Sequence, residues 1–324
     1  MTEEKKMIKD LEVNEEVTIP MLIEGMEERK ASASNQPYIT FTGKDKTGSL
    51  DCKLWGYTME NMSGIKNGDI IMARGTVGMY NDKKQLNMKK NERGKYLFRL
   101  TKEEDNLDLN DFIKTSPCPY EQMISEIQGM INNFTNEDFK ALCNRFLDKY
   151  EDKLKYYPGA KGVHHAYKTG WLYHIYNMMR MGNSLADIYD LNKDLLLTGV
   201  LLHDTGKIPA MNSDMNGVVD DFSLEGAMLD HIVLSIKIFN EISSDLDIDK
   251  EAITLIEHMI ASHHGKLEWG SPVMPMFPEA EALHHLDNMD AKINTMKEHL
   301  ETVESGTVTD KVYALGRRIY KPNL

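Results

Sequence analysis

Histidine and aspartate side chains recur in the second half of this chain in a pattern that suits metal binding. His203 and Asp204 are adjacent and directly follow an apolar run that ends at Leu202. An imidazole and a carboxylate are costly to bury beside such a run unless a cation binds them. Five further candidates surround this pair in the sequence: His174, His231, His263, His264 and Asp287. Neutral imidazoles and carboxylates together favour divalent transition metals such as manganese, iron, cobalt or zinc.

Each candidate is expected on, or just after, the apolar face of a helix. The hydrophobic periodicity predicts helices over 169–181, 193–203, 223–242, 250–262 and 279–304. Helical bundles build metal sites in their cores from ligands that several helices present inward. Two positions stay open at this point. Asp290 could be the ligand in place of Asp287, and His258 could replace His263 or His264.

The composition is that of a folded protein with room for two domains. The chain has 324 residues, of which 41% are hydrophobic and 27% are charged. No apolar stretch approaches the roughly 20 residues that a membrane span needs, and the N-terminus leads into no apolar signal-peptide core. Cys52, Cys118 and Cys143 show no C-x-x-C spacing, which argues against a disulfide framework and a cysteine zinc site. We therefore expect a cytoplasmic protein without a membrane partner.

The net charge of −13 is distributed unevenly along the chain. Residues 1–100 carry 17 Lys and Arg against 15 Asp and Glu, and the remaining 224 residues carry 21 against 36. A near-neutral part and an acidic part indicate two modules with different roles. The acidic module does not exclude a polyanionic substrate, because bound divalent metals are often the largest local charges in a site.

Residues 1–100 are predicted to form a small β-barrel. Five runs of alternating or β-branched character, separated by turn residues, lie at 16–26, 37–43, 49–55, 69–79 and 85–88. A short helix is expected at 57–65, and five strands with a helix before the fourth are typical of an OB-fold. The polar stretch 101–118 is expected to be a linker. Residues 119–324 are predicted to be an all-α bundle of about eight helices.

The ordered set of histidines and aspartates resembles the HD-domain metallophosphohydrolases, in their two-metal version. The resemblance covers about residues 163–300. It implies four ligands for one metal ion, namely His174, His203, Asp204 and Asp287. It implies that Asp204 bridges to a second ion that is bound by three histidines, His231, His263 and His264. Catalytic roles would fall to Asp204 and to Lys207, which would contact a phosphate unless it is simply an exposed lysine after a helix end.

Such an arrangement indicates hydrolysis of phosphate esters. Two cations about 3.5–4 Å apart can activate a bridging water and stabilise the charge that gathers on a phosphoryl group. A metal-bound hydroxide is available near neutral pH, so no serine or cysteine nucleophile is required. The chain contains no G-x-S-x-G, no G-x-x-x-x-G-K-[ST] and no dinucleotide fingerprint. The predicted reaction is therefore phosphodiester or phosphomonoester hydrolysis.

Aromatic and basic residues in the predicted barrel indicate binding of single-stranded nucleic acid. OB-folds bind such strands by stacking bases on aromatic side chains beside a positively charged groove. The aromatic candidates are Tyr38, Phe41, Trp55, Tyr57 and Tyr80. The basic candidates are Lys44, Lys46, Lys53, Lys83, Lys84, Lys89, Lys90, Arg93 and Lys95. The alternative is that some of the rings only fill the barrel and that the lysines form a solvated hairpin.

A barrel followed by an HD-like module resembles the YhaM-type 3′–5′ exoribonucleases over nearly the whole chain. The run His-His-Ala-Tyr at 164–167 and its spacing to His174 are the most specific part of the resemblance. It implies a manganese- or cobalt-stimulated enzyme that trims single-stranded RNA, and often single-stranded DNA, from the 3′ end to nucleoside 5′-monophosphates. One departure is Trp171-Leu172-Tyr173 before His174, where a smaller apolar residue and an acid are expected, and this bears on substrate fit.

Two alternative functions are weighed against the exoribonuclease. The first is an HD-type nucleotide or cyclic-dinucleotide phosphohydrolase, although the stretch 265–272 contains no Gly-Tyr-Pro. The second is a non-catalytic RNA-binding adaptor, against which the complete ligand set speaks. His164 and His165 either approach the site or are loop residues before a helix. A homo-oligomer is compatible with the sequence.

Overall fold

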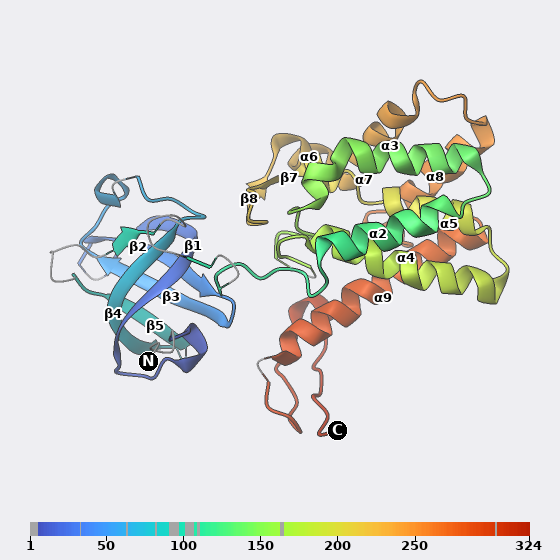
Figure 1. The fold of residues 1–324 in the computed structure, drawn as a ribbon. Coiled ribbons are helices and arrows are strands. Elements are labelled where there is room, and N and C mark those ends of the chain that lie inside the picture. Colours follow the sequence, from blue (N-terminus) through green and yellow to red (C-terminus); the bar gives the residue numbers. More distant parts are fainter. Residues whose placement is uncertain are drawn as a thin grey trace. The chain divides into compact units, whose positions relative to one another are not determined.

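The computed structural model describes residues 6–32, 34–62, 64–81, 83–90, 97–100, 107–108, 111–162, 165–301 and 303–324. The chain divides into two units, Met1–Thr115 and Ser116–Leu324 (Figure 1). No helix in the described ranges is both long enough and apolar enough to cross a membrane.

The first unit contains a six-stranded sheet that closes on itself. Its strands are β1 (Glu16–Lys30), β2 (Pro37–Asp45), β3 (Gly48–Trp55), β4 (Ile70–Tyr80), β5 (Lys83–Met88) and β6 (Leu97–Arg99). The hydrogen-bonded order is β1-β2-β3-β5-β4-β6, and β1 also pairs with β4, so that β1 to β5 form a ring (Figure 1). The predicted five-stranded OB-fold barrel is confirmed, with the short β6 added beside β4.

Strand alternation sorts the barrel residues into an inner and an outer face. Ile39, Phe41, Leu50, Cys52 and Leu54 of β2 and β3 are buried in the barrel core. The same strands pair Tyr38 with Trp55 and Thr40 with Lys53, and these residues lie on the outer face because side chains alternate along a strand. A Cβ at Gly43 would lie 2.2 Å from the sulfur of the buried Met21, so a larger residue there would displace this side chain.

Two connecting segments differ from the predictions. The helix expected at 57–65 is only the 3-10 turn η2 (Met59–Met62), followed closely by Gly64 in a left-handed conformation with φ 76°. The expected linker 101–118 is not polar throughout, because Phe112 and Ile113 are buried. Asp111 also accepts a hydrogen bond from the ammonium of Lys46 at 2.7 Å, which fixes this segment to the barrel.

The second unit is a bundle of helices (Figure 1). Its α-helices are α2 (Tyr120–Asn132), α3 (Glu137–Leu154), α4 (Gly170–Tyr189), α5 (Lys193–Leu202), α6 (Lys207–Ala210), α7 (Leu224–Ser243), α8 (Lys250–Ser262) and α9 (Pro278–Glu301). Every residue of α5 from Asp194 to Leu202 is buried. The residues that follow α5, His203 and Asp204, therefore emerge in the interior of the bundle.

The second unit is helical, as predicted, and a small β-hairpin is inserted among its helices. A two-stranded hairpin, β7 (Met211–Ser213) and β8 (Val219–Phe222), lies between α6 and α7. Its turn is held by Asp214, whose Oδ1 accepts hydrogen bonds from the backbone N–H groups of Asn216 and Val218, each at 2.9 Å. Gly217 takes the left-handed conformation with φ 77°. The dipeptide Asn216-Gly217 is a turn signal in the sequence.

Candidate metal centre and nucleic-acid face

Asp204 lies at the centre of a group of imidazoles. The Nε2 atoms of His203 and His174 are 3.3 and 4.0 Å from its Oδ2. The Nε2 atoms of His231 and His263 are 3.6 and 3.7 Å from its Oδ1. These histidines come from α4, from α7 and from the residues just after α5 and α8. Elements distant in the sequence therefore direct four ring nitrogens at one carboxylate that is only 3% exposed.

The hydrogen bond at Nδ1 determines that Nε2 is the nitrogen with which these imidazoles can bind a metal. Nδ1 of His203 is 2.8 Å from the carbonyl oxygen of Val200, and Nδ1 of His263 is 2.7 Å from that of Ile260. A carbonyl only accepts, so Nδ1 carries the proton and Nε2 keeps a lone pair. Within the described ranges, the Nε2 atoms of His203, His231 and His263 are buried without a hydrogen-bond partner. Buried lone pairs aimed at a carboxylate are typical of histidines that bind a metal.

Asp287 and Asp290 contact opposite sides of His174. Oδ1 of Asp287 is 3.3 Å from Nε2 of His174, on the side of Asp204. Oδ2 of Asp290 is 2.7 Å from Nδ1 of the same ring and 2.6 Å from Nε2 of His165. Its Oδ1 accepts a hydrogen bond from the amide of Asn177 at 3.1 Å. Asp287 therefore lies with Asp204 and the histidines around it, and we call these residues the Asp204 group. Asp290 instead contacts His174 at Nδ1, on the side away from Asp204.

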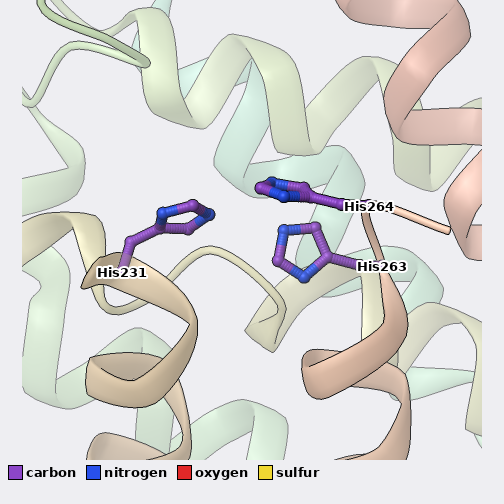
Figure 2. Close-up of side chains that lie close together, drawn as sticks. All are labelled: His231, His263 and His264. Atoms are coloured by element: carbon purple, nitrogen blue, oxygen red, sulfur yellow. The ribbon is translucent and has the colours of Figure 1, made fainter. Parts of the chain in front are cut away.

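His263 and His264 meet His231 across the gap between α7 and the end of α8. Figure 2 shows the three rings turned toward one another. One nitrogen of each lies within 4.8 Å of the others, and the same holds for ligand atoms of His174, His203 and Asp204. His258, the alternative ligand, does not join this group, because its Nε2 accepts a hydrogen bond from the backbone N–H of Met276 at 3.1 Å.

Of the two alternatives for His165, the one in which it approaches the site agrees with the structure. His165 is fully buried, and its Nδ1 is 2.9 Å from the hydroxyl of Tyr167. It therefore belongs to the hydrogen-bonded layer behind His174 and not to an exposed loop. His164 lies outside the described residues.

A break in α7 brings His231 to the group. Asp230 has φ 60° and ψ 162° inside the helix, a conformation that is costly for any residue except glycine. Its carboxylate accepts hydrogen bonds from the backbone N–H and from Nδ1 of His231. Gly206 permits the close approach of α7 to the turn after α5, because a Cβ there would lie 2.0 Å from the carbonyl oxygen of His231 and 2.4 Å from the N of Ser235.

The charges of the group favour a bound cation. Burial raises the pKa of Asp204, but Lys207, whose Nζ is 2.6 Å away, and the neighbouring histidines outweigh burial and hold the pKa well below its usual value. Burial lowers the pKa of His174, but Asp287 and Asp290 outweigh it and raise this pKa to about 9. Burial holds the pKa of His263 well below its usual value. Ionised carboxylates and the neutral imidazole of His263 are forms that bind metals, whereas His174 has to release a proton before its Nε2 can bind one.

The residues around Asp204 border a cavity of about 710 Å³. Asp204, Lys207, His231, His264 and Asp287 are among its lining residues. Imidazole nitrogens and carboxylate oxygens are the donors that divalent transition metals prefer, and an open side is what a catalytic site needs for its substrate. The residues therefore fit divalent metal ions that face a substrate-sized cavity.

The outer face of the barrel carries an aromatic cluster on β2, β3 and β4. The rings of Tyr38 and Trp55 have centroids 4.6 Å apart at an interplanar angle of 34°. Nζ of Lys53 is 4.5 Å from the ring centroid of Tyr80 and 5.9 Å from that of Trp55. Trp55 is 45% exposed and Tyr80 is 59% exposed. We call Tyr38, Lys53, Trp55 and Tyr80 the barrel cluster. Three of them lie on β2 and β3, and OB-folds bind oligonucleotides on the face of their second and third strands.

The other barrel candidates are less well placed to contact nucleic acid. The prediction that Phe41 contacts nucleic acid is wrong: the ring is only 2% exposed, because β2 turns it into the barrel core. Lys83, Lys84, Lys89 and Lys90 are exposed. The ammonium of Lys84 donates to the carbonyl of Leu11, and that of Lys89 lies 3.2 Å from the carboxylate of Glu16.

Tyr57, Arg93 and Lys95 are further barrel candidates. Tyr57 packs partly buried against the core. Arg93 and Lys95 lie outside the described residues.

Comparisons with known proteins agree with this architecture. Residues 22–92 match the OB-fold nucleic acid binding domain, and residues 171–292 match the HD domain. The chain is 37% identical over 320 residues to the 3′–5′ exoribonuclease YhaM of Geobacillus sp. (strain WCH70), which covers 98% of this chain and 95% of that protein. It is 34% identical over 314 residues to the 3′–5′ exoribonuclease YhaM of Bacillus subtilis (strain 168), with 96% of each covered. The chain belongs to the YhaM 3′–5′ exoribonuclease family.

Proposed function

We propose that this protein is a metal-dependent 3′–5′ exoribonuclease that hydrolyses single-stranded RNA to nucleoside 5′-monophosphates. The observation that carries the proposal is the convergence of four imidazole Nε2 atoms on Asp204 beside an open cavity. Sequence similarity to 3′–5′ exoribonucleases over nearly the full length supports RNA as the substrate and cleavage from the 3′ end. Single-stranded DNA is a second substrate to be tested on the same site.

Two divalent ions, Mn²⁺ in our proposal, are assigned to the Asp204 group. One would be held by His174, His203, Asp204 and Asp287. The other would be held by His231, His263 and His264, with Asp204 shared. Bound ions of this kind supply an activated water and stabilise the charge that develops on a phosphoryl group.

The chain's own residues contribute orientation and charge. Asp290 holds Nδ1 of His174, and the carbonyls of Val200 and Ile260 hold Nδ1 of His203 and His263, so that each Nε2 faces Asp204. Lys207 lines the cavity with its Nζ at 2.6 Å from Asp204. We assign this ammonium to binding a phosphate of the RNA backbone, since cations contribute most of the affinity for nucleic acids.

The barrel cluster is proposed to bind the single strand. Exposed rings stack on bases of any sequence, and Lys53 between two of the rings supplies a positive charge for the backbone. We place the protein in the cytoplasm, because Cys52, Cys118 and Cys143 are free thiols, which is usual in a reducing compartment.

The test uses single-stranded RNA labelled at either end, with Mn²⁺ and with the Asp204→Ala variant as control. We expect a 5′-labelled strand to give a ladder and a 3′-labelled strand to release the labelled mononucleotide first, both without signal in the variant. Early release of a 5′ label would reverse the polarity. Binding without cleavage would identify an adaptor, and hydrolysis of nucleotides or cyclic dinucleotides alone would identify a different HD-type phosphohydrolase.

A further inference from the structure

Two exposed aromatic rings line the cavity beside the metal centre. Trp269 ends the 3-10 turn η4 (Leu267–Trp269) after α8 and is 43% exposed, and Phe222 ends β8 and is 50% exposed. Both line the 710 Å³ cavity together with Asp204 and Lys207. Rings of this size exposed at the wall of a strongly charged cavity call for a ligand that has both an apolar face and negative charge.

Lysine side chains accompany both rings. Nζ of Lys266 is 4.5 Å and Nζ of Lys292 is 5.9 Å from the ring centroid of Trp269. Nζ of Lys161 is 5.7 Å from the centroid of Phe222. Exposed aromatic faces among cations are the combination with which proteins bind unpaired nucleotides, since the ring stacks on the base and the cations contact phosphate.

The backbone of Trp269 is tied to a histidine of the metal centre. Its carbonyl accepts the hydrogen bond from Nδ1 of His264 at 2.7 Å. The turn is closed by hydrogen bonds from the backbone N–H groups of Trp269 and Gly270 to the carbonyls of Lys266 and Leu267, each at 3.0 Å. Gly270 makes this turn with φ 94°, a value that other residues rarely adopt. The backbone that carries the indole is therefore fixed relative to His264, whereas Phe222 lies on the hairpin.

We propose that Trp269 is the stacking platform for the nucleobase of the 3′-terminal nucleotide. The proposal rests on the exoribonuclease function and adds the residue that positions the nucleotide to be released. That nucleotide has to fit inside the cavity, while the remaining strand leads out of it, so the ring tied to the metal centre is assigned to the last base. Phe222 is assigned to the base before it. Stacking accepts every base, so the platform confers no sequence preference.

The first test measures whether a change in the enzyme and a change in the substrate have independent effects. Trp269→Ala and Trp269→Phe are compared with the unaltered protein on RNA that ends in a normal nucleotide or in an abasic one. We expect Trp269→Ala to lower kcat/KM on normal RNA roughly tenfold or more, and Trp269→Phe to lower it much less. On the abasic RNA, the unaltered protein and Trp269→Ala should be equally efficient.

Three results would overturn the assignment. Equal losses on both RNAs would mean that the indole contacts no base and only stabilises the turn that holds His264. A loss that disappears only when the penultimate base is removed would exchange the roles of Trp269 and Phe222. Unchanged kcat/KM in a folded Trp269→Ala variant would remove the platform altogether, while leaving the exoribonuclease function intact.

The second test does not depend on cleavage. In a Trp55→Phe background the remaining indoles are Trp171, which is fully buried, and Trp269, which is exposed. Adenosine 5′-monophosphate should quench the fluorescence of this protein at constant metal concentration, and ribose 5-phosphate should not. The additional change Trp269→Phe should abolish the quenching. Equal quenching by both compounds, or quenching that survives this change, would contradict stacking on Trp269.

Discussion

The barrel cluster and the metal centre place their functional side chains in opposite ways. In the barrel, the side chains come from neighbouring strands, lie on the outer face and contact one another only through rings and one lysine. In the helical unit, they come from five helices or the residues next to them, are largely buried, and are held by hydrogen bonds on the side away from Asp204. We therefore expect the barrel cluster to lose function in small steps, residue by residue, and the metal centre to fail as a whole.

The largest effect is expected from Asp204, because four imidazoles converge on it. Asp204→Ala should abolish RNA cleavage and lower the amount of bound Mn²⁺, as measured by single-turnover assays and by metal analysis of the purified protein. The RNA affinity of the barrel, measured by fluorescence anisotropy, should be unchanged. A joint loss of RNA affinity and cleavage would show that the two regions are not separable.

The next effect tests the support behind the metal centre. Asp290→Asn keeps the size of the side chain but removes the negative charge that accepts from Nδ1 of His174. Loss of such a supporting carboxylate typically costs 10–100-fold in metal affinity or activity, and we expect about that loss in Mn²⁺ affinity by titration calorimetry. The matched control is Glu281→Gln on the exposed surface of the same helix, which should change nothing. Full Mn²⁺ affinity in Asp290→Asn would mean that the negative charge of Asp290 is not needed to support His174.

A smaller effect is expected in the barrel, where two aromatic residues offer a matched pair. Trp55→Ala should weaken binding of single-stranded RNA about tenfold, raising KM with kcat unchanged, since one stacked base is lost. Its thermal stability should be retained, because the ring is exposed.

Phe41→Ala is the control from the opposite face of the same sheet. Removal of this buried ring should lower the free energy of unfolding by about 3–5 kcal/mol, measured by denaturant titration. If Trp55→Ala destabilised the barrel as much as Phe41→Ala, the outer-face assignment of Trp55 would be wrong.

The smallest effect concerns the break in α7. Asp230→Gly should relieve the backbone cost of the positive φ, about 1–3 kcal/mol, and so raise or preserve the free energy of unfolding. It should also weaken Mn²⁺ binding, because Nδ1 of His231 loses its acceptor, whereas Asp230→Asn should keep much of the affinity. A gain in Mn²⁺ affinity in Asp230→Gly would show that the carboxylate does not orient His231.

Local periodicity explains which parts of the fold could be predicted. Strand alternation gave the runs of β1 to β5 to within a few residues, and helical periodicity gave α8 with its observed ends. The same alternation rule could have excluded Phe41, since Tyr38 and Phe41 are three positions apart on one strand and must face opposite sides. The hairpin after α6 also had a readable signal in Asn216-Gly217.

The pairing of side chains across helices could not be predicted from spacing. Asp287 and Asp290 are three residues apart on α9 and occupy similar positions on the helix surface. Only the packed position of His174 decides which carboxylate meets Nε2 and which meets Nδ1. The break at Asp230 is likewise a tertiary effect, because an aspartate inside an apolar periodic run carries no local signal for a positive φ.

Gly206 has a consequence for the second of the two metal ions that we propose. The half of the centre on α7 reaches Asp204 only because position 206 lacks a side chain, so even the methyl group of Gly206→Ala would push His231 away. The half formed by His174, His203 and Asp287 does not depend on that contact. In the proposed two-ion arrangement, the missing methyl group at position 206 would therefore determine whether the second ion can bind.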